Sequence, residues 1–273
     1  MNVMKKTLVV MSVLFLAALS VDVFAIGNIG PPTAELKAGQ WSVGGDYAYS
    51  DIDLDASKMK HTNSAGDPAM MISFEFEDVK TNFYYATLGY GLTENLEVYG
   101  RLGIADIKGR ERWPEYSADW GSNFDNDIAG GVGTRFTFYK QNKVRWGVTA
   151  QMNWIDTSWD RKETSIVYGD IKRKLDLSAY DLLVAIGPTV DMGGWKLYGG
   201  PFFYMFDGDF DYKETWTGDG GGWEKGKADV EEDSSFGGYI GAAIPLAKNT
   251  DMTFEVAAIS GGWSAGTGVI VKF

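Results

Sequence analysis

The sequence predicts an all-β protein, an antiparallel up-and-down transmembrane β-barrel of about ten strands. Ten segments alternate between apolar and polar residues with a period of two, which is typical of strands with one apolar face. After residue 25, no apolar run reaches the length of about eighteen residues that a spanning helix needs. Because lipid offers no partner to an unpaired backbone group, a membrane protein without spanning helices has to be a closed barrel.

The ten segments each have about the length that a tilted strand needs to cross the hydrocarbon layer. In the first segment, for example, Trp41, Val43, Tyr47 and Tyr49 fall on one face. The seventh differs from the others because its apolar residues occupy both faces. The segments cover residues 39–50, 82–92, 95–107, 127–139, 144–154, 179–190, 195–206, 235–246, 252–260 and 263–273.

The links between the segments alternate in length. Short links lie near Thr93, Lys140, Met192 and Ala247, and the last link, around Gly261, is also brief. Long links cover residues 50–78, 109–124, 158–174 and 208–233. Tight turns on one rim and long loops on the other are the layout of an outer-membrane barrel. We therefore expect one barrel domain, residues 26–273, with both of its ends on the short-turn rim.

Residues 1–25 have the pattern of a secretory signal peptide. Lys5 and Lys6 precede an apolar run from Leu8 to Leu19, which is too short to span a membrane. Small residues then lead to Ala25, after which we expect cleavage. A membrane anchor is the alternative interpretation. The chain has no cysteine, so we expect neither a lipid-anchor cysteine nor a disulfide framework.

Two stretches resemble the small outer-membrane β-barrel proteins of Gram-negative-type bacteria, in the style of the barrel of outer membrane protein A without a periplasmic domain. They are "GYGLTENLEVYGRLG" and the terminal "WSAGTGVIVKF". The resemblance implies a location in the outer membrane, contact with its lipid, and insertion by the barrel-assembly machinery. That machinery would read Phe273 and its alternating neighbours Val271, Val269 and Thr267. Val271 departs from the pattern, which prefers an aromatic residue there. The resemblance indicates a class of structure and no activity.

Charged residues lie opposite the apolar face, where they would point into the lumen. Unpaired charges in a narrow interior would cost several kcal/mol each, so a balanced set predicts ion pairs. We expect the long side chains of Glu97, Arg101, Arg135 and Arg145 to interlock with Asp181 and Glu255. A ten-stranded lumen is little wider than an eight-stranded one, which side chains already fill, so a side-chain plug is favoured over a gated ion path. The predicted network comprises Asp46, Glu97, Arg101, Asp127, Arg135, Arg145, Asp181, Lys196, Glu255 and Lys272.

The formal net charge is −12, and much of the acidic excess falls in the long links. An acidic rim repels nucleic acid and could attract divalent cations, although a merely solvated surface is favoured. The acidic clusters "DIDLD" at residues 51–55 and "DGDFD" at residues 207–211 invite a calcium interpretation. The second is no EF-hand, because Tyr212 stands where glycine is needed and Gly218 where the bidentate acid should be.

An enzyme is disfavoured. The single histidine, His61, has no adjacent aspartate of the kind that the ten-stranded outer-membrane proteases, the omptins, use in an Asp–His pair. No Ser/His/Asp set can be assembled without it, and we expect no cofactor. A soluble lipocalin-type barrel is also disfavoured, because its charges would have to lie outside. The sequence therefore predicts a structural and surface-interaction role, with a narrow porin-like channel as the alternative and an omptin-like protease as the third candidate.

Overall fold

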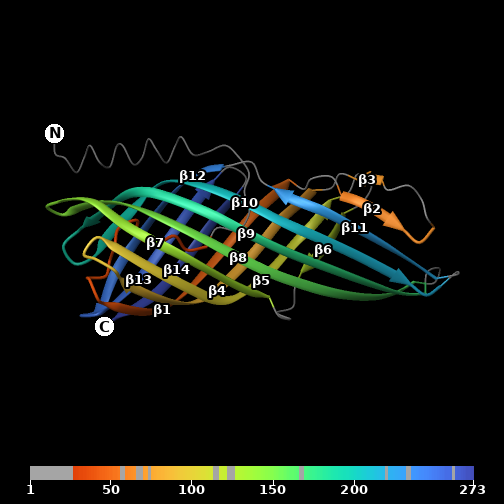
Figure 1. Ribbon diagram of the computed structural model, residues 1–273, viewed down its shortest axis with the longest axis horizontal. Coiled ribbons are helices and arrows are strands. Elements are labelled where there is room, and N and C mark those ends of the chain that lie inside the picture. The colour runs from red at the N-terminus through yellow and green to blue at the C-terminus, as the bar shows by residue number, and fades with distance from the viewer. Residues whose placement is uncertain are drawn as a thin grey trace.

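A computed structural model describes residues 27–55, 59–65, 70–72, 75–112, 117–121, 127–165, 169–218, 221–231, 235–259 and 262–273. Ten strands form a closed barrel, which Figure 1 shows from the side. They are β1 (Trp41–Asp55), β4 (Glu75–Gly91), β5 (Leu96–Arg112), β7 (Ile128–Gln141), β8 (Val144–Ser165), β9 (Gly169–Asp191), β10 (Lys196–Trp216), β12 (Ser235–Ala247), β13 (Thr250–Ile259) and β14 (Gly262–Lys272). The expected signal peptide lies outside the described residues.

Every barrel strand is antiparallel to both neighbours. β10 pairs with β12, and β14 pairs with β1, where Ser42 lies opposite Lys272, so the sheet closes on itself. Each of the ten predicted segments falls on one of these strands, so the prediction of a ten-stranded up-and-down barrel is confirmed. The described residues contain no helix long and apolar enough to span a membrane.

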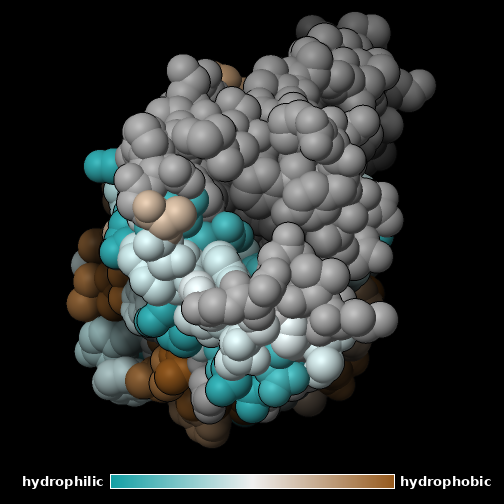
Figure 2. Space-filling model, turned by 90° about the vertical axis from the view of Figure 1, so that its right-hand side faces the viewer, coloured by the Kyte–Doolittle hydropathy of each residue, from teal (hydrophilic) through white to brown (hydrophobic). Residues whose placement is uncertain are grey.

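The outer face of the barrel carries a band of exposed apolar side chains. Leu102 is 63% exposed and Leu88 51%, while their neighbours in sequence, such as Arg101, point inward and are buried. Figure 2 looks along the barrel from the end opposite the short turns and shows hydrophobic sides around a more hydrophilic end. In water such a surface would be unfavourable, so the band marks the part of the wall that hydrocarbon surrounds.

The prediction of long loops was wrong for most of their length, because the strands continue beyond the apolar band. β8 and β9 extend as one hairpin up to the pair Ser165–Gly169, and β10 continues to Trp216 before β11 (Gly222–Glu231) returns beside it. Three short strands complete this end: β2 (Met59–Asn63) pairs with β11, β3 (Met70–Ile72) pairs with β2, and β6 (Ser117–Gly121) pairs with the upper end of β5. Above the hydrocarbon the outer face meets water, so polar residues that resemble a loop in sequence still form a two-sided strand.

On the side of the lumen away from the short turns, the inward faces of the strands carry a packed apolar layer. Leu175, Leu177, Phe206 and Phe210 are at most 6% exposed and belong to one packed core. This arrangement also explains the seventh segment, in which the inward positions of β10 are as apolar as the outward ones. The lumen thus changes from polar near the short turns to apolar under the hairpins.

Before β1 begins, residues 27–36 lie inside the lumen and residues 37–40 lead to β1 at the rim; we call residues 27–40 the strap. Its backbone leaves the barrel at the short-turn rim, where Gly39 N–H donates to Gly91 O and Gly91 N–H donates to Gln40 O. From there it runs back into the interior, and Ile29 and Thr33 are completely buried. The sequence pattern did not predict this segment, which occupies the polar half of the lumen.

Candidate functional site in the barrel lumen

Nine of the ten charged residues expected in the lumen occupy inward positions of their strands, where alternation along the strand places them. Asp127 immediately precedes β7 and is also buried. Six of the side chains are almost fully buried, at 2–9% exposed: Glu97, Arg101, Asp127, Arg135, Asp181 and Glu255.

Arg135 and Glu97 form the one direct ion pair between two of these ten residues in the described part of the chain. Arg135 Nη1 donates to Glu97 Oε1 at 2.7 Å, and the guanidinium lies over the Tyr99 ring at 4.5 Å. The two residues are Cα partners on β5 and β7. Replacing either partner of such a buried ion pair would leave the other charge buried without a counterion and would destabilise the barrel.

Arg101 reaches Asp181 through Asn153 rather than by a direct ion pair. Its Nε donates to Asn153 Oδ1 at 2.8 Å, and Asn153 Nδ2 donates to Asp181 Oδ1 at 2.6 Å. The register explains the relay, because Arg101, Gly131, Asn153 and Asp181 are successive Cα partners across four strands. Gly131 has no side chain to block the reach of Arg101, and Asn153 stands between arginine and aspartate.

The strap supplies the missing partners of two acids. Glu255 accepts the backbone N–H groups of Ile29 and Gly30 at 2.7 and 2.8 Å. Glu97 uses its second oxygen for the N–H groups of Glu35 and Leu36 at 2.8 and 3.2 Å. Charge-assisted bonds to a backbone segment satisfy buried carboxylates and hold the segment in place.

Glu35 is the charged anchor of the strap. It pairs with Arg145 at 2.5 Å and with Lys196, two bases that the sequence pattern placed in the lumen. Burial alone would raise the pKa of Glu35, but the attraction of Arg145, Lys196 and Lys272 prevails and lowers the pKa to about 2. The carboxylate is therefore charged at neutral pH.

The remaining three predicted residues have local partners. Asp46 accepts a bond from Thr87 at 2.9 Å, and Asp127 accepts one from Thr157 at 2.6 Å. Lys272 pairs with Asp251 at 2.7 Å, near the short-turn rim. The lumen network is thus a set of short local contacts joined through the strap, rather than one interlocked cluster.

Little space is left around these groups. A cavity of about 50 Å³ borders the strap beside Asp46 and Arg101, and one of about 10 Å³ lies higher, between Phe83 and Phe206. The strap carried a weak signal in the sequence: Ile29, Ala34 and Leu36 are apolar without strand alternation, and they precede the first strand. Such residues need burial, but nothing in the pattern indicated where.

The expected assembly residues lie on the outer face at the end of β14. Thr267, Val269 and Val271 point outward, and Phe273, 72% exposed, is held by its N–H bond to Trp41 O at 2.9 Å. β14 therefore closes the barrel against β1, with its terminal aromatic on the face that meets lipid.

The acidic clusters lie on the tall hairpins. Asp211 pairs with Lys227 at 2.7 Å, and Asp207 accepts a bond from the Tyr180 hydroxyl at 2.6 Å. In the described ranges no three His, Cys, Asp or Glu side chains lie close enough to hold a metal ion. His61 is in β2, opposite Gly226 of β11, and its side chain lies outside the described part.

No protein-family model and no curated protein sequence matches the chain. Among solved structures, it is similar to the outer membrane protein OprG from Pseudomonas aeruginosa (9% identity, 87% of this chain and 97% of that one, TM-score 0.38). It is also similar to the outer membrane protease OmpT from Escherichia coli (9%, 83% and 94%, 0.43). A third is Ail, the attachment invasion locus protein of Yersinia pestis (13%, 86% and 99%, 0.31).

Proposed function

We propose that this outer-membrane barrel is a closed scaffold that gives structural support and presents its tall acidic hairpins at the cell surface. The observation that carries the proposal is the strap, which occupies the polar half of the lumen and is bound there by Glu97 and Glu255. Beyond the strap, inward apolar side chains pack against one another in one buried cluster. A hydrated path would have to cross both layers.

Conductance in planar bilayers tests the closed lumen. The refolded wild-type barrel is expected to show very low conductance, whereas a variant without residues 27–38 should conduct because the polar half is emptied. Glu35→Gln keeps the strap but removes its ion pairs with Arg145 and Lys196, so it should show intermittent openings. Lys37→Gln changes an exposed strap residue and serves as the control. Large, stable wild-type channels would refute the closed scaffold.

A narrow channel for ions or small solutes is the second candidate. It is favoured by the charges of both signs on the wall behind the strap, which would line a polar path if the strap moved. Under this alternative, wild-type protein would open without any substitution, under voltage or on addition of a solute. Wild-type openings that disappear when the strap is cross-linked to the wall would favour the channel over the scaffold.

The surface role requires that the hairpin tips face the cell exterior. Thr217 and Gly221, on either side of the β10–β11 tip, are exposed, and the outer face of β10 carries Asp209 and Lys213, which suit water and not lipid. An epitope inserted near Gly221 should be reached by antibody on intact cells. Detection only after permeabilisation would place the hairpins on the other side of the membrane and contradict the proposed role.

A further inference from the structure

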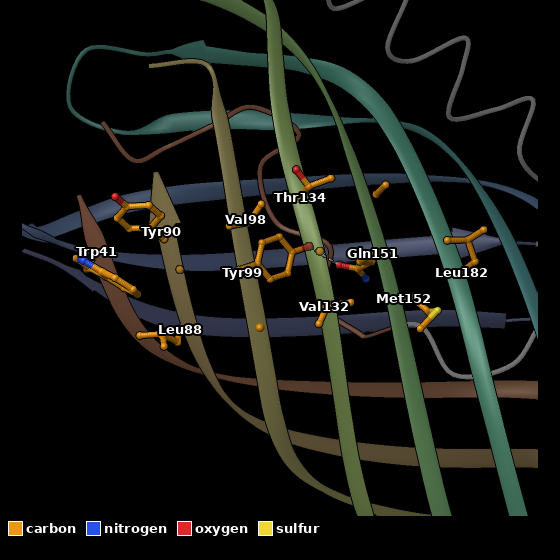
Figure 3. A pocket seen from close by; sticks show the side chains of 14 residues that line it. Trp41, Leu88, Tyr90, Val98, Tyr99, Val132, Thr134, Gln151, Met152 and Leu182 are labelled. Carbon is orange, nitrogen blue, oxygen red and sulfur yellow. Dashed lines mark hydrogen bonds between the residues drawn. The ribbon is translucent and has the colours of Figure 1, made fainter. Parts of the chain in front are cut away.

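A groove of about 710 Å³ crosses the outer face of the barrel and is open to the surroundings (Figure 3). Its outward-facing lining carries no charged side chain. Trp41 and Leu88 lie at one end and Leu182 at the other, with Val132 and Met152 between them (Figure 3). These side chains point away from the interior, whereas Tyr99 and Gln151, which also border the groove, are buried on the lumen side.

Two parallel rows of cross-strand partners form the groove. The first row runs through Trp41, Tyr90, Val98, Thr134 and Ala150. The second row runs through Leu88, Gly100, Val132, Met152 and Leu182. Small residues interrupt both rows: Gly100 has no side chain, and Thr134 and Ala150 have short ones. The hollow therefore results from residue size along lines that the strand register fixes.

The rows climb from the short-turn rim toward the middle of the membrane. Trp41 is the first residue of β1, whereas Leu182 lies nine residues before the end of β9. Six neighbouring strands span about 24 Å at about 4.8 Å per strand. With strands tilted by about 35–45°, this path rises about 14–17 Å. One leaflet of the hydrocarbon core is about 15 Å thick, so the groove matches a single leaflet.

The open end of the groove lies at the level where lipid headgroups begin. The rings of Trp41 and Tyr90 contact each other there, tilted by 43° with centroids 4.5 Å apart, and such aromatic residues mark the girdle of a barrel at the membrane interface. The rest of the groove lies in the apolar band, where the surrounding medium is hydrocarbon. A ligand that enters from this end therefore has its polar part at the rim and its apolar part along the rows.

We propose that the groove binds one acyl chain of a phospholipid from the leaflet on the short-turn side. A flexible acyl chain can follow the open trough along the two rows. Its contacts with Val98, Val132 and Met152 gain dispersion energy that a flat wall would not provide. A second copy of the barrel fits less well, because two convex walls meet along a line and leave a concave trough empty. The lipid is thus bound at one defined position on the outer wall of the barrel.

Gly100→Leu is the decisive variant. A side chain built at Gly100 meets nothing closer than Gly131 O at 3.9 Å, so leucine fills the trough without straining the wall. Gly45→Leu is the matched control, since Gly45 is an outward glycine of β1 away from the groove, with Tyr85 O at 3.6 Å as its nearest neighbour. Ala150→Leu fills the same trough from the other row and replaces Gly100→Leu if that variant fails to fold. Heat-modifiable gel mobility reports folding for each variant.

Native mass spectrometry of the full mature barrel, released from nanodiscs of a single phosphatidylethanolamine, measures the bound lipid. Wild-type and Gly45→Leu are expected to retain one lipid, and Gly100→Leu should reduce the retained fraction at least fivefold. Spin-labelled phospholipid in intact bilayers should show one fewer immobilised chain per barrel. Equal retention in Gly100→Leu and wild-type would overturn the proposal, as would a wild-type dimer that Gly100→Leu converts to a monomer.

Discussion

Arg135 and Glu97 form a buried ion pair between neighbouring strands, and the same Glu97 carboxylate also binds the strap. The side chains of glutamate and arginine are 3% and 10% exposed. One carboxylate therefore joins the wall of the barrel to the segment that fills it. Stability and closure of the lumen depend on the same group.

Glu97→Gln should destabilise the barrel by about 3–5 kcal/mol, because it leaves the Arg135 charge buried without its counterion. Urea-induced unfolding from lipid vesicles, followed by tryptophan fluorescence, measures the change. Asp176→Asn is the control: it removes an ion pair with Lys174 whose side chains are 42% and 54% exposed, and it should change stability by less than about 1 kcal/mol. Equal effects of the two variants would mean that water reaches Glu97.

The docking of the strap should depend on pH through Glu35. Its pKa of about 2 in the folded protein lies below the ordinary value of 4.5, so the charged carboxylate stabilises the docked state above pH 4.5. This contribution, on the order of 3 kcal/mol, is lost as the pH falls toward 2. Protease cleavage within residues 27–38 of vesicle-embedded protein should therefore increase between about pH 4 and 2. Glu35→Gln should be cleaved at neutral pH already, and an unchanged acid profile in this variant would contradict the assignment.

Gly131→Ala should destabilise the barrel by about 1–3 kcal/mol. A methyl group there would lie 2.3 Å from Asn153 Oδ1 and 3.1 Å from Arg101 Nε, so the relay from Arg101 to Asp181 has to shift. Gly100→Ala, on the outer face beside it, has free space and serves as the control. The same unfolding assay compares them, and a Gly131→Ala barrel as stable as Gly100→Ala would show that the relay is dispensable.

Deletion of Phe273 should lower the amount of folded barrel in the membrane, if the assembly machinery reads the terminal aromatic with Thr267, Val269 and Val271. Phe273→Tyr keeps an aromatic ring at the end of β14 and should assemble normally. Cell fractionation and heat-modifiable mobility measure both variants. Unchanged levels after the deletion would show that the apolar ending contributes only lipid contacts.

Alternation along the chain was sufficient to predict the barrel and its inside and outside. Leu102 and Arg101 are adjacent in sequence, and their opposite exposure follows from the period of two alone. The same rule placed nine of the ten lumen charges on inward positions of their strands. These features depend on local geometry, and local geometry can be read from the order of residues.

The partners of those charges depended on the tertiary structure. Arg101 meets Asn153 because the register of two strand pairs places them together, and Glu35 reaches Arg145 and Lys196 only because the strap folds back into the lumen. Sequence separations of 52, 110 and 161 residues carry no periodic signal. The sequence by itself therefore determined the barrel and which side chains face its interior. Closure of the sheet decided what fills that interior, because only a closed wall brings these distant groups into contact.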